Sequence, residues 1–152
     1  MSMPMARYML RIEFLILDFG LRGSEMDETG LKQRTKVFSL RVMKLVGALP
    51  ETSAGRTIGN QLVRSATSVG ANYRSACRGR SKPEFVAKLG IVVEEADECG
   101  YWLELISDGE LLKNTLVEPL LTEANELTAI MVASHKTAQS SIKNQKSKIK
   151  NV

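Results

Sequence analysis

The sequence predicts an all-α fold, an antiparallel up-down-up-down four-helix bundle. Apolar residues recur every three or four positions in four separate segments, which is the spacing of amphipathic helices. Proline, glycine and helix-capping residues separate these segments, and no stretch shows the alternation typical of strands. The chain has 152 residues, enough for one domain with a sizeable core, and four helices of about 20 residues with short loops favour a bundle.

Each helix is predicted from its apolar face and its boundaries. Pro50 ends the first helix, Thr52 or Ser53 caps the second, Ser81 caps the third, and Asp108-Gly109 ends the third. A fourth helix is expected from about Leu116 or Pro119. The expected core positions, in chain order, are Phe38, Val42, Leu45 and Leu49; Leu62, Ala66, Val69, Tyr73 and Ala76; Phe85, Leu89, Val92, Ala96, Cys99, Leu103 and Ile106; and Leu120, Ala124, Leu127 and Met131.

The two ends of the chain differ from its centre. Residues 1–25 show no continuous amphipathic period, and we expect them to be a leader outside the fold, with Met26 as the true start. Residues 26–139 form the predicted bundle, and 140–152 form a basic, lysine-rich tail that is either a frayed helix end or disordered. Because no run of about 20 apolar residues occurs, we expect no membrane association, and two cysteines favour the reducing cytoplasm.

Charge is segregated along the chain. Residues 31–88 hold twelve lysines and arginines against two acids, whereas residues 89–130 hold ten acids against one lysine. Arg56, Arg64, Arg74 and Arg78 fall within about 80° of one another on the second helix, opposite its apolar face. Such a face can bind a phosphate backbone, or it can be a solvated or salt-bridged surface of the fold.

A second unusual surface lies on the third helix. Ile91, Tyr101, Trp102 and Leu105 lie well away from its core stripe. Large apolar side chains in such a position are typical of a surface that a second subunit covers, although neighbouring helices of the same bundle can also cover part of it.

Catalytic and metal-binding patterns are missing from the sequence. The only histidine, His135, is expected in a capping or solvated position near the end of the last helix, and the acids of the third helix do not converge on a metal cage. Cys99 is expected in the core, while Cys77 lies beside Arg74 and Arg78, which can make a thiol more reactive. We therefore expect no enzymatic activity, no cofactor and no metal.

Residues 61–106 carry a set of words that together are specific: QLVRSATSVGANYR, RSKPEF, KLGI and EEADECGYWLEL. This stretch resembles the four-helix bundle proteins known as 23S ribosomal RNA intervening-sequence proteins, and the resemblance extends over about residues 31–137. It implies a bacterial bundle that assembles into a ring, typically a pentamer. It also implies a relation to the accessory proteins of diversity-generating retroelements, in which a basic pentamer engages reverse transcriptase and nucleic acid.

Two functions follow as hypotheses. The first is a non-catalytic oligomeric bundle that binds nucleic acid, RNA or DNA with RNA favoured, by phosphate contact through the four arginines and the lysine tail. The second is a scaffold or adaptor whose basic face binds an acidic protein, such as a reverse transcriptase-type enzyme or the acidic helix of a neighbouring subunit.

Overall fold

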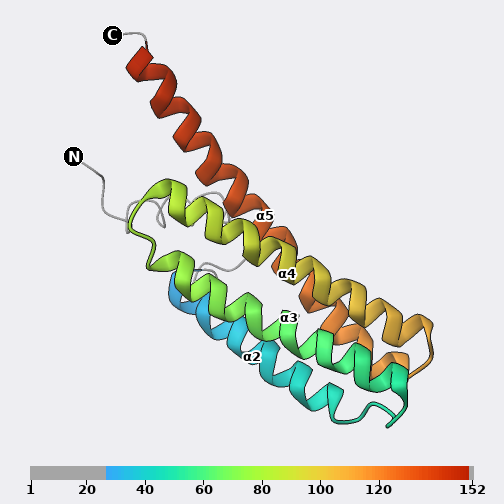
Figure 1. The fold of residues 1–152 in the computed structure, drawn as a ribbon. Coiled ribbons are helices and arrows are strands. Elements are labelled where there is room, and N and C mark those ends of the chain that lie inside the picture. The colour runs from blue at the N-terminus through green and yellow to red at the C-terminus, as the bar shows by residue number, and fades with distance from the viewer. Residues whose placement is uncertain (1–26, 151–152) are drawn as a thin grey trace.

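The computed structural model describes residues 27–150, and this part of the chain contains four α-helices and no strand. Their bounds are α2 Glu28–Val46, α3 Ser53–Cys77, α4 Lys82–Asp108 and α5 Asn114–Lys150. The helices lie side by side, and α5 extends past the end of the other three (Figure 1). The prediction of an all-α fold with four helices is confirmed. The predicted leader, residues 1–25, lies outside the described residues.

Short polar side chains begin the helices as expected. The Thr52 hydroxyl accepts a hydrogen bond from the Gly55 amide at 3.1 Å, and the Ser81 hydroxyl accepts one from the Glu84 amide at 3.2 Å. Both amides belong to the first helical turn, where they have no carbonyl partner within the helix. Of the two candidate caps for α3 the structure has Thr52, and the predicted cap of α4 at Ser81 is confirmed.

Two helix boundaries differ from the prediction. The first helix ends at Val46 rather than at Pro50, because the chain tightens into a turn at Gly47 in which the Ala48 amide bonds to the Leu45 carbonyl. The last helix begins at Asn114 and contains Pro119 in its second turn. A proline this close to a helix start removes only one backbone hydrogen bond, so the helix continues through it.

A single hydrophobic core joins all four helices. The predicted core residues are buried, apart from Leu49, which is half-buried against the core. The longest uninterrupted stripe belongs to α4, where residues from Phe85 to Ile106 at alternating spacings of four and three are at most 4% exposed. This stripe places α4 against both α3 and α5 and makes it the central packing element of the bundle.

A hydrogen bond and small residues bring neighbouring helices into close contact. Ser39 of α2 donates to the Ala66 carbonyl of α3 at 2.9 Å, and Gly59, nearer the start of α3, faces Val46 at the end of α2. A Cβ at Gly59 would lie 2.9 Å from the Val46 Cγ1 atom, so the missing side chain lets the two helices approach. Between α4 and α5, Gly90 faces His135.

An ion pair joins the first helix to the last. The Arg34 guanidinium on α2 donates to Glu123 on α5 through Nε at 2.7 Å and through Nη2 at 2.8 Å, and it also contacts Glu126. Arg34 and Glu123 are about one-fifth exposed, with side-chain accessibilities of 21% and 17%. These bonds raise the pKa of Arg34, so the guanidinium stays charged and holds α2 against α5.

The end of α5 is not packed against the rest of the bundle. Its last buried residue is Ala138, and residues 143–149 are all exposed although they remain helical. The predicted start of the basic tail, residue 140, thus falls inside a continuous helix and close to the point where burial ends. Within residues 27–150, no helix is apolar over a length that could cross a bilayer.

The α4 stripe generates the first prediction. Replacing Leu89 or Leu103 by alanine should lower the free energy of unfolding by about 2–5 kcal/mol, because each side chain is fully buried and leaves a cavity. Leu40→Ala is the matched control, since Leu40 is 54% exposed and its loss should cost less than about 0.5 kcal/mol. Urea denaturation measures all three. Equal losses at Leu40 and Leu103 would contradict the assigned core.

Candidate nucleic-acid interface

The four predicted arginines lie on or directly after α3 and are all exposed, but they do not form one uniform surface. Arg56, near the start of the helix, donates a hydrogen bond to the Glu51 carbonyl at 2.9 Å. Arg74 and Arg78 lie one turn apart at the other end of α3. Between these ends, Arg64 is engaged by the neighbouring helix.

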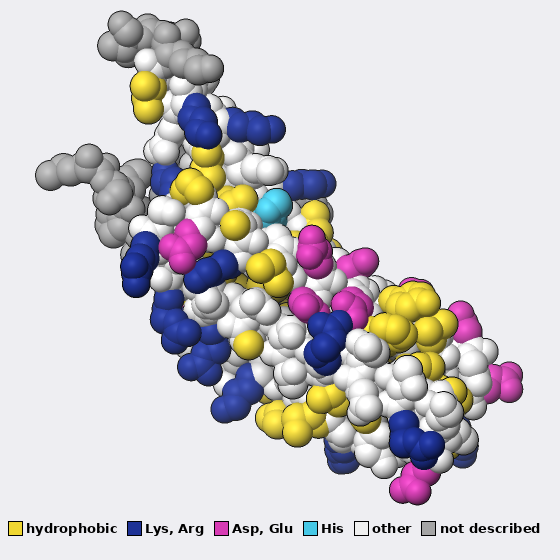
Figure 2. Space-filling view, viewed as in Figure 1, with side chains coloured by type: hydrophobic (Ala, Val, Ile, Leu, Met, Phe, Trp, Pro, Cys, Tyr) yellow, Lys and Arg dark blue, Asp and Glu magenta, His cyan; other side chains and the backbone are white. Residues whose placement is uncertain are grey.

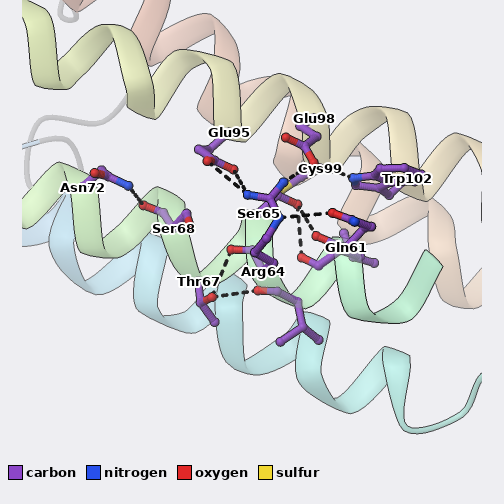
Figure 3. Close-up of polar contacts among 12 residues, drawn as sticks. Gln61, Arg64, Ser65, Thr67, Ser68, Asn72, Glu95, Glu98, Cys99 and Trp102 are labelled. Atoms are coloured by element: carbon purple, nitrogen blue, oxygen red, sulfur yellow. Dashed lines mark hydrogen bonds and ion pairs between the residues drawn. The ribbon is translucent and has the colours of Figure 1, made fainter. Parts of the chain in front are cut away.

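Arg64 is held by two carboxylates of α4 (Figure 3). Its Nη1 atom lies 3.3 Å from Glu95, and its Nη2 atom donates to Glu98. The Arg64 side chain still keeps 48% of its surface exposed. The sequence left open whether Arg64 is available to bind phosphate or forms salt bridges within the fold. In the structure Arg64 forms salt bridges.

The Arg64 ion pair is part of a small network. Glu98 also accepts a hydrogen bond from the indole Nε1 of Trp102 at 2.9 Å. The hydrogen bond from Arg64, and then the one from Trp102, lowers the pKa of Glu98. Glu98 is therefore ionised at neutral pH and balances positive charge in the middle of the arginine face.

Arg74 and Arg78 remain as open positive charge. Neither makes an ion pair with any residue in the described range 27–150. Arg80, in the connection to α4, is also exposed. The acids of α4 that hold Arg64 lie farther along that helix, whereas Glu84 in its first turn accepts a hydrogen bond from the Arg80 amide at 2.8 Å. Arg74 and Arg78 therefore supply the open positive charge where α3 ends. This is the same end of the molecule from which α5 extends (Figure 1).

The four residues predicted as an oligomer interface divide into two groups. Ile91 and Tyr101 are 43% and 53% exposed, whereas Trp102 and Leu105 are half-buried. Trp102 packs against the core, and its ring centroid lies 5.0 Å from that of Tyr101. Figure 2 shows hydrophobic side chains gathered next to acidic ones on the face over α4. The bundle itself thus accounts for part of this apolar flank.

Sequence reasoning missed a second apolar surface. Val37, Leu40 and Met43 on the outer face of α2 are 41%, 54% and 52% exposed. Their spacing of three residues could have revealed them, because it runs beside the buried positions Phe38 and Val42. Basic residues are interspersed with these apolar ones along the same helix.

Two single residues differ from expectation. Burial raises the pKa of the Cys77 thiol, so the thiolate is disfavoured despite the nearby arginines. The expectation that these arginines make Cys77 more reactive is therefore wrong. His135 neither caps the helix nor stands in solvent: α5 continues for about four more turns, and the half-buried imidazole faces Gly90 of α4. Within residues 27–150, no group of His, Cys, Asp or Glu side chains is placed to hold a metal ion.

The Glu98 network generates a prediction about acid sensitivity. Its pKa in the folded protein lies below the ordinary 4.5, so the stabilisation is present above pH 4.5 and is lost as the pH falls through the folded pKa. Glu98→Gln should lower the urea midpoint at pH 7, and the difference from the unchanged protein should shrink towards pH 3. Glu94→Gln, an exposed carboxylate without an ion pair in the described range, is the control. A difference that is the same at both pH values would contradict the network.

Comparisons with known proteins agree with this architecture. A search of curated proteins found no match to the chain. Among solved structures, the chain is similar to a protein of unknown function from the S23 ribosomal protein family of Bacteroides thetaiotaomicron. The two are 29% identical, the match covers 72% of this chain and 97% of the other, and the TM-score is 0.66. The family model for 23S rRNA-intervening sequence protein matches residues 28–133, which span all of α2, α3 and α4 and half of α5. The chain therefore belongs to the 23S rRNA-intervening sequence protein family.

Proposed function

We propose that this protein is a non-catalytic, oligomeric four-helix bundle that binds nucleic acid, RNA in particular, in the cytoplasm. The observation that carries the proposal is the open positive charge of Arg74 and Arg78, which have no ion-pair partner within residues 27–150. Guanidinium groups bind phosphate through paired hydrogen bonds, and phosphate contacts need no base recognition.

The proposed bundle is antiparallel, with its helices running up, down, up and down. Its support is the order of contacts, in which residues late in α2 face residues early in α3: Val46 faces Gly59, whereas Thr35 faces Gly70. The same order holds between α4 and α5, where Gly90 faces His135 and Gly100 faces Asn125. The end of α3 and the start of α4 lie at one end of the bundle, where Arg74 and Arg78 are one helical turn apart.

Several bundles are proposed to join into a ring, with five copies as the expected number from the family resemblance. The support within this chain is the exposed apolar surface of Ile91 and Tyr101, continued by the half-buried Trp102 and Leu105. A closed ring repeats one heterologous contact, so it also multiplies the basic ends of the bundles.

A scaffold function is the second candidate, and one observation favours it. Arg64 already binds Glu95 and Glu98 across two helices, so the arginine face is chemically suited to an acidic helix. The partner would be an acidic protein such as a reverse transcriptase-type enzyme. Counterion release separates the two candidates, because it makes nucleic-acid affinity fall steeply with salt.

Binding to RNA tests the proposed function. A single-stranded RNA should bind at about 50 mM salt and lose affinity by orders of magnitude by about 200 mM if several phosphates are neutralised. Arg74→Ala with Arg78→Ala should weaken binding to all sequences alike and lower the salt slope by about two. Lys36→Ala with Lys44→Ala removes the same charge from α2 and is the matched control. Fluorescence anisotropy measures the affinities. Equal effects of the two double variants, or no binding at the lower salt concentration, would overturn the arginine assignment.

The mass in solution tests the ring. Light scattering should give several times 16.8 kDa, with five copies expected. Tyr101→Glu should dissociate the assembly and leave the helix content unchanged, because Tyr101 is 53% exposed in the single chain. Ala129→Glu, at an exposed position on α5, is the control for added charge. A monomer at micromolar concentration, or an assembly unaffected by Tyr101→Glu, would contradict the proposed interface.

A further inference from the structure

The C-terminal end of α5 carries a second group of positive charges, separate from the arginines of α3. No acid follows Glu126 in the sequence, while lysines occur at positions 136, 143, 146, 148 and 150. Lys143, Lys146 and Lys148 are exposed, and none of them forms an ion pair with another residue in the described part of the chain. Unlike Arg64, these side chains have no carboxylate beside them.

The shape of this segment is also distinctive. Residues 139–150 continue the helix for about 18 Å beyond the last buried residue, Ala138. Figure 1 shows this part of α5 projecting alone from the bundle. All residues from 143 to 149 are exposed, so both flanks of the helix are accessible.

Different types of side chain lie on different faces of the projecting helix. Ser140, Asn144 and Ser147, spaced by four and three, share one face. Lys143 and Lys148 lie on the two flanks of that face, each about 70° from its centre. Small polar side chains thus form a strip with a cation on either side.

We propose that residues 139–150 of α5 bind duplex DNA by entering its major groove. A helix about 10–12 Å across fits the B-form major groove, which is about 12 Å wide. Lys143 and Lys148 then reach the phosphates of the two strands, and Ser140, Asn144 and Ser147 face the base edges. This surface is separate from the arginine face of α3, and the inference goes beyond the RNA binding proposed above.

Other anionic partners fit these residues less well. The major groove of A-form RNA is deep and narrow, so it does not admit a helix. A helix lying on a membrane needs a broad apolar face, often with aromatic side chains. Beyond Ala138 the described helix has only Ile142 and Ile149 as large apolar residues, and no aromatic one.

The experiment uses the full chain with a DNA duplex of about 20 base pairs, the RNA duplex of the same sequence, and vesicles containing phosphatidylserine. In the Arg74→Ala, Arg78→Ala variant, which lacks the arginines proposed to bind RNA, DNA should bind at least about tenfold more tightly than RNA at about 50 mM salt. Lys143→Gln with Lys148→Gln should weaken DNA binding about tenfold or more and lower the salt slope by about two. Lys36→Gln with Lys44→Gln is the charge-matched control. Equal affinity for the two duplexes, preference for the vesicles, or equal effects of the two double variants would overturn the proposal.

A pair of neighbouring substitutions tests the orientation of the helix. Asn144→Glu places a carboxylate on the face that enters the groove and should weaken DNA binding about tenfold. Gln145→Glu adds the same charge about 130° from the centre of that face and should change affinity less than about threefold. Circular dichroism checks that both variants keep the helix. Equal effects would show general attraction only and overturn groove binding.

Arg74→Ala with Arg78→Ala separates this proposal from the RNA function. Suppose that this arginine variant binds RNA like the unchanged protein, while the lysine variant no longer binds DNA. RNA binding through Arg74 and Arg78 is then wrong, and DNA binding by the end of α5 is supported. If instead the arginine variant no longer binds RNA while the lysine variant still binds DNA, RNA binding through Arg74 and Arg78 is supported and DNA binding by the end of α5 is wrong.

Discussion

The ion pair between Arg64 and the carboxylates of Glu95 and Glu98 determines how charge is distributed over this bundle. It joins the basic helix α3 to the acidic helix α4 at mid-length, where both are anchored by the core. Charged pairs near a surface contribute modestly to stability, so its main consequence is electrostatic. It balances the centre of the arginine face and leaves Arg74 and Arg78, at the end of α3, as open charge. The same carboxylate of Glu98 accepts a hydrogen bond from Trp102, which belongs to the predicted oligomer interface on α4.

Packing explains why these two helices meet in this register. The stripe of α4 from Phe85 to Ile106 is buried without interruption, and small residues such as Ser65 on α3 allow close approach, with the Cys99 thiol 3.3 Å from the Ser65 hydroxyl. This contact lies next to the Arg64 ion pair (Figure 3). Core packing therefore positions the polar network, and the network in turn separates the two ends of the arginine face.

Periodicity predicted the core well because burial is a property of whole helix faces: every expected core residue except Leu49 is buried. The caps at Thr52 and Ser81 were predictable because their role is local. The pairing of Arg64 was left open, since it depends on the rotation of α4 against α3. The half-buried state of Trp102 and the position of His135 depend on neighbouring helices in the same way. Helical angles within one segment do not contain that information.

The central claim is that anionic partners bind at two places, Arg74 and Arg78 where α3 ends and the lysines on the projecting end of α5, and not at the basic residues of α2. Mass spectrometry of chemically labelled lysines and arginines, with and without bound nucleic acid, tests it most directly. The account predicts that RNA protects Arg74 and Arg78, and that duplex DNA protects Lys143 and Lys148, while Lys36 and Lys44 on α2 stay reactive. Protection spread evenly over all exposed lysines and arginines, or strongest on α2, would contradict it.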